Sequence, residues 1–279
     1  MNLSRASSTI RTKKLLRNSQ INYVLNTMIY AKPISTKWIH LEETESTNTF
    51  LHNRLEQAND NEAEFIIVST DYQTTGRGQR GNHWEAERAK NLLFSLLLHP
   101  TFVPIRQQFV LSQILSLSIK EELNRHANGF SIKWPNDIYY REQKICGILI
   151  EHTLQDGKIA ATIAGVGLNV NQEVFVSSAP NPVSLKQIIG KDYLREELLQ
   201  AIVQRFVGYY ERLQEVPDTD FSTAYHNSLF RVQGIHRFVD HNGEFAATII
   251  KVEPDGILIL QDTNEQIRRY AFKEVSFVI

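Results

Sequence analysis

Residues 71–84 read Asp-Tyr-Gln-Thr-Thr-Gly-Arg-Gly-Gln-Arg-Gly-Asn-His-Trp, and they join two apolar segments, 64–70 and 91–99, that predict strands. About twenty residues separate those strands, and a polar connection of that length inside a compact domain is usually functional or disordered. Its glycines let backbone N–H groups approach a ligand closely, and Arg77 and Arg80 add positive charge. The loop therefore favours an anionic ligand, with phosphate as the first candidate.

The run Gly76-Arg77-Gly78-Gln79-Arg80-Gly81 has the spacing of a dinucleotide-binding fingerprint. That fingerprint requires a helix to begin at the glycines and an acidic residue about twenty positions later. Here the glycines lead toward a strand, and positions 99–104 read His-Pro-Thr-Phe-Val-Pro. A Walker-type Gly-Lys-Ser/Thr sequence is absent as well. Both standard nucleotide-binding motifs are therefore excluded.

The composition suits a globular protein with an acidic body. The chain has 279 residues, is 42% hydrophobic and has a formal net charge of −1. Residues 1–41 contain seven Lys/Arg and no Asp/Glu, which leaves 23 basic and 31 acidic residues in the remainder. A body of that sign disfavours non-specific nucleic-acid binding. The single cysteine indicates a reducing, cytoplasmic setting, and no apolar run is long enough for a membrane span.

Three regions are expected along the chain. Residues 1–37 read as a loosely ordered extension, although their basic, hydroxyl-rich composition also resembles a targeting segment and Met28 could be the natural start. Residues 38–232 predict one large domain, and residues 233–279 contain five short strands that predict a small β-barrel. In the large domain we expect strands at 38–41, 64–70, 91–99, 138–141, 144–154 and 158–170. We expect helices after Ser46 and at 106–127, 184–189, 192–215 and 221–229, with Asn128-Gly129 capping the second of them.

Three further segments carry polar groups where a site could form. Ser46-Thr47-Asn48 either caps the following helix or offers hydroxyl and N–H groups to a ligand. Lys133 ends an apolar strand beside a Pro-Asn-Asp turn, so it is either a fixed cation or a lysine that reaches the surface. The glycines before Asn169 allow close backbone approach. Cys146 lies among apolar residues and reads as buried, while zinc spacing and a serine-nucleophile elbow are absent.

Taken together, these segments resemble the biotin–protein ligase family over nearly all of residues 38–279. Lys133-Trp-Pro-Asn-Asp137 followed by Lys-x-x-Gly-Ile-Leu-x-Glu at 144–151 is highly specific, as is its order with Ser46-Thr47-Asn48, the glycine-arginine loop and Gly165-Val-Gly-Leu-Asn169. The resemblance implies an α+β fold: a mixed-sheet catalytic domain of the class II aminoacyl-tRNA synthetase type with an SH3-like barrel. It also implies a two-step reaction, in which biotin and ATP give biotinyl-5′-AMP and a lysine of a biotin carboxyl carrier protein or domain then takes the biotin.

The resemblance also implies roles for particular residues. Lys133 and Arg77 would be catalytic. The biotin-binding residues would be Ser46, Thr47, Asn48, Gln73, Arg77, Gly78, Gln79, Lys133 and Gly147, and the ATP-binding residues would be Gly76, Arg80, Trp84 and Asn169. No metal ligands are expected from the protein, because Mg²⁺ would arrive on the ATP phosphates. Asp137 is a hypothetical acceptor for the proton of the carrier lysine.

Two features differ from many members of the family. Gln79 stands where many relatives have arginine, which would loosen retention of the acyl-adenylate. The N-terminal winged helix of the repressor members is not recognised, so no repressor function and no DNA partner are expected. No membrane partner is expected either. A homodimer is possible. The alternatives are a lipoate–protein ligase, which shares the chemistry but not the Lys-Trp-Pro-Asn-Asp motif, and a non-catalytic binding module.

Overall fold

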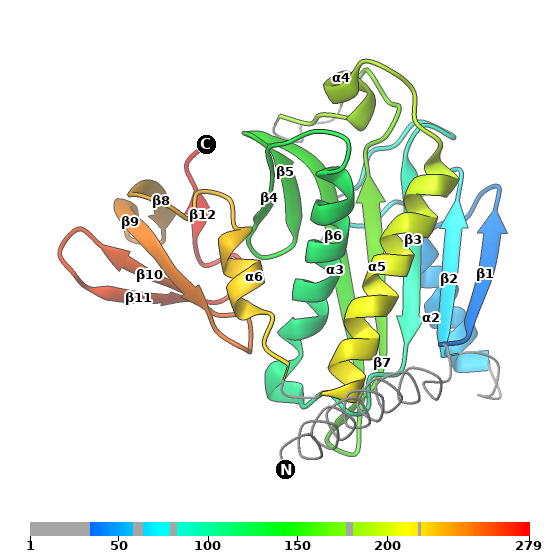
Figure 1. Cartoon of the computed structure of the whole chain (residues 1–279), viewed down its shortest axis with the longest axis horizontal. Helices are drawn as coiled ribbons and strands as arrows, with labels where there is room; N and C mark the ends of the chain where they lie inside the picture. The colour runs from blue at the N-terminus through cyan, green and yellow to red at the C-terminus, as the bar shows by residue number, and fades with distance from the viewer. Residues whose placement is uncertain (1–33, 58–63, 79–82, 177–180, 217–218) are drawn as a thin grey trace, which may run out of the picture. The chain divides into compact units, whose positions relative to one another are not determined.

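The computed structural model describes residues 34–57, 64–78, 83–176, 181–216 and 219–279. Residues Thr36–Ile279 form one compact unit that contains a large and a small β-sheet (Figure 1). The expectations for the N-terminal extension fall on residues outside the described ranges, apart from 34–37. Gln79, Arg80 and Gly81 of the loop also lie outside them.

The large sheet has seven strands in the order β1-β2-β3-β7-β6-β5-β4. β1 and β2 are parallel, and every other neighbouring pair is antiparallel. The strands are β1 Thr36–Leu41, β2 Phe65–Thr70, β3 Leu92–Leu98, β4 Phe130–Lys133, β5 Asp137–Tyr140, β6 Gln143–Gln155 and β7 Lys158–Leu168. This mixed sheet with helices confirms the α+β class expected from the sequence.

Helices cover both faces of this sheet. α3 Phe109–Leu123 and α5 Arg195–Glu215 lie on one face, and α2 Thr47–Gln57 lies on the other (Figure 1). β2 contributes to both layers because successive residues of a strand point to opposite faces. Phe65 contacts Phe206 of α5, while Ile66 packs with Leu51 of α2. A strand buried on both faces needs a continuous apolar run, which the sequence supplies here.

Two helix boundaries correct the sequence prediction. The helix expected at 106–127 is a short 3₁₀ turn, Ile105–Gln107, followed by α3, which ends at Leu123. Gly129 does have a left-handed φ of +113°, but it lies in the turn before β4 and does not cap the helix. The apolar stripe of the helix ends at Leu123, and residues 124–129 beyond it are half-buried or exposed. α5 begins at Arg195 and not at Asp192; the short helices α4 Leu185–Ile189 and α6 Ser222–Asn227 lie near their expected positions.

The small sheet contains the five short strands expected after residue 234. They are β8 His236–Asp240, β9 Gly243–Val252, β10 Leu258–Asp262, β11 Ile267–Tyr270 and β12 Ser276–Phe277, in the order β11-β10-β9-β8-β12. β11 and β12 stand at opposite edges, and no pairing within residues 219–279 joins them. The second antiparallel sheet is therefore confirmed, whereas a closed barrel is not.

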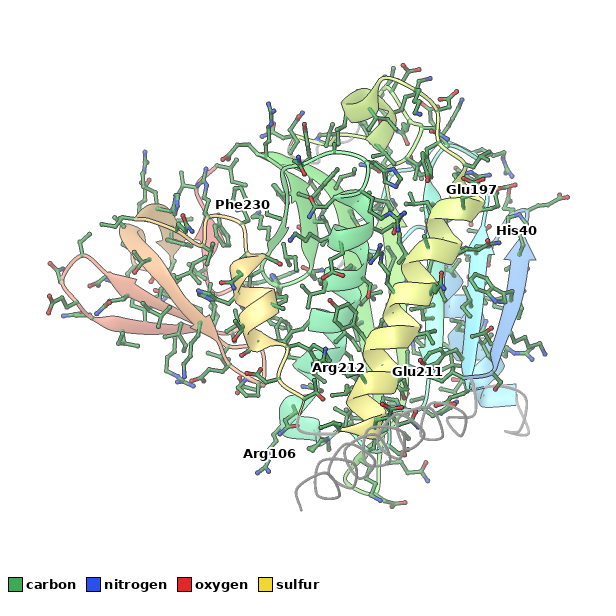
Figure 2. The ribbon with its side chains drawn as sticks, viewed as in Figure 1. His40, Arg106, Glu197, Glu211, Arg212 and Phe230 are labelled. Carbon is green, nitrogen blue, oxygen red and sulfur yellow. The ribbon has the colours of Figure 1, made fainter. Side chains whose placement is uncertain are left out.

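Aromatic contacts join the small sheet to the large one. Phe230 lies between the sheets, with its ring 5.4 Å from that of Tyr139 on β5 and 5.7 Å from that of Phe277 on β12 (Figure 2). The buried Trp134 donates its indole N–H to the carbonyl of Gly256 across 2.9 Å. These contacts place the end of β4 directly against the small sheet.

Two sequence expectations concern single groups. Cys146 is free and fully buried, and burial raises the pKa of its thiol, which confirms a packing role. Within the described residues, no helix is both long enough and apolar enough to cross a bilayer.

Candidate ligand-binding site

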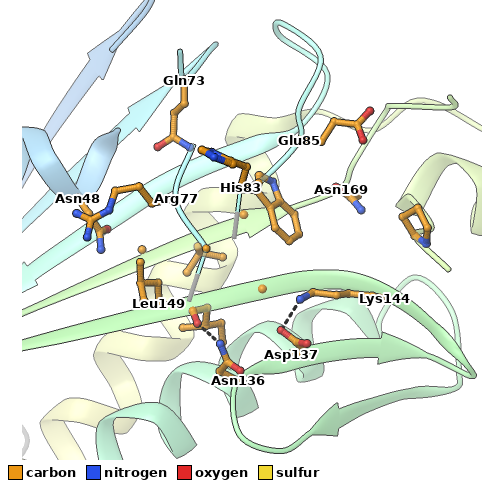
Figure 3. A pocket seen from close by; sticks show the side chains of 18 of the residues that line it. Asn48, Gln73, Arg77, His83, Glu85, Asn136, Asp137, Lys144, Leu149 and Asn169 are labelled. Carbon is orange, nitrogen blue, oxygen red and sulfur yellow. Dashed lines mark hydrogen bonds and ion pairs between the residues drawn. The ribbon is translucent and has the colours of Figure 1, made fainter. Parts of the chain in front are cut away.

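A cavity of about 620 Å³ opens above β6 and β7, beside the glycine-rich loop (residues 73–84) (Figure 3). Most of the residues singled out from the sequence line this cavity: Ser46, Thr47, Asn48, Gln73, Arg77, Gly78, Trp84, Lys133, Gly147 and Asn169. Gly76 is buried behind the lining, where a side chain would meet the carbonyl oxygen of Trp84 at 2.7 Å. The positions expected for Gln79 and Arg80 lie outside the described residues.

The first end of the cavity is formed by the N-terminus of α2. Ser46, Thr47 and Asn48 are each only 3% exposed. The side-chain oxygen of Gln73 accepts hydrogen bonds from the backbone N–H of Thr47 at 2.8 Å and from its hydroxyl at 3.2 Å. The Ser95 hydroxyl lies 2.6 Å from both the Thr47 hydroxyl and the Asn48 side-chain oxygen. These polar groups are therefore held in fixed positions in an otherwise buried wall.

A glycine allows Asn48 to reach this position. A Cβ atom on Gly165 of β7 would lie 2.2 Å from the side-chain oxygen of Asn48. Gly165 pairs across the sheet with Ser95 of β3, so the hydroxyl that contacts Asn48 comes from the neighbouring strand. The Asn48 amide donates to the Glu151 carboxylate at 2.6 Å. Glu151 also accepts from Arg77 at 3.3 Å, so one carboxylate connects the α2 terminus to the glycine-rich loop.

Trp84 forms the floor of the central part of the cavity. Gly147 of β6 and Gly167 of β7 are directly opposite each other in the sheet. A Cβ atom on either one would lie less than 3.0 Å from the Trp84 indole, so the two glycines make the flat surface on which the ring lies. The backbone holds Trp84 there through its N–H, which donates to the Gly76 carbonyl at 3.0 Å. The indole N–H is buried and has no hydrogen-bond partner among the described residues.

Two lysines and an aspartate lie at the end of β4. Antiparallel pairing places Lys133 opposite Asp137, and the Lys144 ammonium forms an ion pair with Asp137 at 2.7 Å (Figure 3). Lys133 donates to the Tyr139 hydroxyl at 3.2 Å. Burial lowers the pKa of Lys133, with Lys144 and Arg231 adding repulsion, and attraction to Asp137 only partly opposes this. Burial and Asp137 raise the pKa of Tyr139, which keeps its hydroxyl protonated.

Asn169 stands at the opposite end of the cavity from α2. It is 3% exposed, and its amide donates to the Val183 carbonyl at 3.1 Å, which fixes the orientation of the amide. The side-chain oxygen of Asn169 is buried without a partner among the described residues. A buried carbonyl oxygen without a donor is costly unless a ligand supplies one.

Sequence reasoning missed three residues that the structure places in this network: Ser95, Lys144 and Glu151. Lys144 and Glu151 begin and end the Lys-x-x-Gly-Ile-Leu-x-Glu motif, so their spacing was visible but their partners were not. Ser95 is fully buried within an apolar strand, and an isolated serine there was the available signal. No three His, Cys, Asp or Glu side chains within the described ranges are arranged to hold a metal ion.

The fold is similar to that of solved biotin protein ligases. The biotin protein ligase from Aquifex aeolicus, in complex with biotin and ATP, superposes with a TM-score of 0.69 at 27% identity, covering 86% of this chain and 97% of that one. The large mixed sheet therefore matches the catalytic fold of biotin protein ligases.

Sequence comparison agrees with the structural match. Residues 41–169 match the model of the biotin/lipoate A/B protein ligase family. The bifunctional ligase/repressor BirA of Bacillus subtilis (strain 168) is 27% identical over 260 residues, which are 91% of this chain and 77% of the relative. Biotin–protein ligase 2 of Arabidopsis thaliana is 33% identical over 157 residues, 53% of this chain and 46% of the relative. These matches confirm the family resemblance found in the sequence.

Proposed function

We propose that this protein is an ATP-dependent biotin–protein ligase, which joins biotin to AMP and then transfers it to a carrier-protein lysine. The observation that carries the proposal is the cavity itself. It brings a buried set of polar groups at the α2 terminus, the cations of three segments and an orphan amide oxygen into one continuous space. A small polar ring, a carboxylate and a nucleotide each find complementary chemistry there.

The polar ring of biotin is proposed to bind at the α2 end. A cyclic urea has one carbonyl acceptor and two N–H donors, so it needs donors and acceptors in a fixed arrangement. The hydroxyls of Ser46 and Thr47 and the amide of Asn48 supply both kinds of group, and Gln73 and Ser95 hold Thr47 and Asn48 in place. Burial strengthens these hydrogen bonds and excludes water, which suits a small uncharged head group.

Activation of biotin requires two anions to meet, because its carboxylate attacks the α-phosphate of ATP. Arg77, Lys133 and Lys144 line the cavity, and we propose that they offset this repulsion. Lys144 is added to the two residues expected from the sequence because its ammonium lies at the cavity surface beside Asp137. Correct alignment of carboxylate and phosphorus removes up to about 7–11 kcal/mol of barrier. No general base is required, because the carboxylate is already ionised at neutral pH.

The nucleotide is proposed to bind over Trp84 and toward Asn169. The indole offers an aromatic surface for the base, and the unpartnered Asn169 oxygen accepts a hydrogen bond from an amino group. The sequence resemblance implied that Asn169 binds ATP, and this proposal places it at the amino group of the base. We expect Mg²⁺ to arrive on the ATP phosphates, where it would neutralise charge on the transferring group.

The transfer step requires a neutral amine from the partner lysine. Asp137 was a candidate acceptor for its proton, but the carboxylate is already paired with Lys144. We therefore propose that Asp137 orients Lys144 in the first step, and that it takes a proton only if Lys144 moves away. The glycine-rich loop would protect the mixed anhydride from water between the two steps.

Further proposals concern the partner of the protein, its small sheet and its assembly. The partner is proposed to be a biotin carboxyl carrier protein or domain, in line with relatives named biotin–[acetyl-CoA-carboxylase] ligase. The small sheet is proposed to be SH3-like, with domain limits of 38–232 and 233–279. We also propose that the protein forms a homodimer, lies in the cytoplasm and has no repressor role.

The test is a complete reaction with separable steps. Biotin and ATP are mixed with the protein and pyrophosphate release is measured, and an acceptor carrier domain is then added and its mass followed. We expect pyrophosphate only with biotin and a mass increase of one biotin on one lysine. Lipoate in place of biotin is the matched control, since the family model covers both ligases. Pyrophosphate release with lipoate but not biotin would overturn the assignment.

A further inference from the structure

One lysine of the small sheet lines the cavity of the large one. Lys273 lies in the turn between β11 and β12 of the small sheet. It is more than one hundred residues beyond Gly167, the last cavity residue in a strand of the large sheet, yet it borders the same space as Lys133, Asn136 and Asp137. The family model matches only residues 41–169 and so includes no part of this turn. Lys273 was not among the residues singled out from the sequence.

The turn holds Lys273 in an unusual backbone conformation. Its φ is +73°, a left-handed value that is unfavourable for a residue with a Cβ atom. The turn is closed by Glu274, whose N–H donates to the Ala271 carbonyl at 3.2 Å and whose carboxylate accepts from the Ala271 N–H at 2.7 Å. The neighbouring residues thus stabilise a backbone conformation that is unfavourable for an isolated lysine.

Aromatic packing fixes the turn against the catalytic segment. The ring of Phe272 lies 5.4 Å from that of Trp134 and 5.9 Å from that of Phe109. Trp134 directly follows Lys133 and bonds to Gly256 of the small sheet. Trp134 and Phe109 are buried, whereas Phe272 is 37% exposed, so two buried rings anchor Phe272 and the adjacent Lys273 lies beside the end of β4.

The chemistry of the proposed reaction identifies what binds at this end. The carboxylate of biotin approaches from the α2 end, and the adenosine extends toward Asn169. The leaving pyrophosphate is a third substituent of the α-phosphorus, beside the attacking oxygen and the ribose oxygen, and its charge needs a further part of the cavity wall that carries cations. Lys133 and Lys273 both line the cavity, and the packing of Phe272 on Trp134 puts the two cations beside the end of β4.

We propose that Lys273 binds the β- and γ-phosphates of ATP and the pyrophosphate product, so that the small sheet completes the nucleotide site. This inference rests on the proposed function. The exposed Lys273 side chain adds a charge-assisted contact, which strengthens ATP binding and stabilises the charge that develops on the leaving group.

The experiment compares Lys273→Ala with Lys273→Arg and with Lys251→Ala. Lys251 is a matched control, because it is an exposed lysine of the same sheet that pairs with Glu253 and does not line this cavity. The KM for ATP and inhibition by added pyrophosphate are measured at saturating biotin. Biotin binding is followed by thermal shift without ATP, and transfer is followed from preformed biotinyl-5′-AMP.

We expect Lys273→Ala to raise the KM for ATP about tenfold and to weaken pyrophosphate inhibition by a similar factor, the effect of one charged hydrogen bond. Lys273→Arg should retain most of the affinity, and Lys251→Ala should match the wild type. Biotin binding and transfer from the preformed adenylate should be unchanged in all variants. If Lys273 only supported the fold, Lys273→Ala would also weaken biotin binding and slow transfer from the preformed adenylate.

Two results would overturn the inference while the proposed function stood. One is an unchanged KM for ATP and unchanged pyrophosphate inhibition in Lys273→Ala with an active wild type. The other is a selective loss of transfer to the carrier domain, which would assign Lys273 to carrier docking. A wild type that releases no pyrophosphate from biotin and ATP would instead overturn the proposed function, and this inference with it.

Discussion

The Gly165→Ala variant tests whether Asn48 must lie directly on the sheet. The new Cβ would sit 2.2 Å from the Asn48 oxygen and 2.9 Å from its Cγ atom. Ordinary contact begins near 3.4 Å, so Asn48 must move by roughly 1 Å. Both its 2.6 Å hydrogen bonds, from Ser95 and to Glu151, are then lost or bent.

The size of the effect follows from those two hydrogen bonds. A neutral hydrogen bond contributes about 0.5–1.5 kcal/mol and one to a charged group about 1.5–3 kcal/mol, so the pair represents about 2–4.5 kcal/mol. If even the lower figure appears in ligand binding, the dissociation constant for biotin rises about 30-fold. The measurement is isothermal titration of biotin into wild type and variant.

The matched control is Gly208→Ala. Gly208 lies in α5, and a Cβ atom added there would meet no heavy atom within 4 Å. Alanine in a helix interior should stabilise the protein by about 0.5–1 kcal/mol and leave biotin affinity unchanged. A Gly165→Ala variant that binds biotin with wild-type affinity would refute the reasoning. The double variant Gly165→Ala/Asn48→Ala should bind no worse than Asn48→Ala, because the clash no longer exists.

Three further predictions concern the catalytic and junction residues. Burial lowers the pKa of Lys133, so the rate of pyrophosphate release should fall as pH rises through that lowered pKa. Lys133→Arg should move this fall to higher pH. An identical alkaline limb of the pH–rate profile in both proteins would contradict the proposed role of Lys133. Because the folded state disfavours the Lys133 ammonium, Lys133→Met should raise the free energy of unfolding at neutral pH, and urea titrations should show this gain disappearing as pH rises above the unfolded pKa of about 10.4. Trp134→Phe leaves the Gly256 carbonyl without its donor and should lower the free energy of unfolding by about 1–3 kcal/mol in the same urea assay; wild-type stability would show that this bond does not hold the small sheet.

Local sequence signals predicted the strands and most helices well. The segments 64–70 and 91–99 became β2 and β3 within a residue at each end, because both are apolar runs bounded by turn residues. The helix expected to run to residue 127 ended at Leu123, since propensity alone does not say where the core stops. The closed barrel was not confirmed, because short strands and turns predict pairing along the chain but not whether the first and last strands meet.

For the site, too, some features could be predicted from the sequence and others could not. The candidate site residues could be found by their motifs, and most of them do line one cavity. Their partners could not be found in this way. Asn48 bonds to Glu151, 103 residues away, and to Ser95, 47 residues away, and such pairs depend on strand order and register.

By itself, the sequence determined which segments become strands and helices and which polar residues stand at their ends, because those properties depend on neighbours within a few turns or residues. The tertiary structure alone decided that Gly147 faces Gly167 beneath Trp84, that Asp137 pairs with Lys144, and that a turn of the small sheet brings Lys273 to the cavity. Contacts of that kind arise only when distant segments pack together, since register and sheet-to-sheet packing are set by the whole core and not by any local pattern.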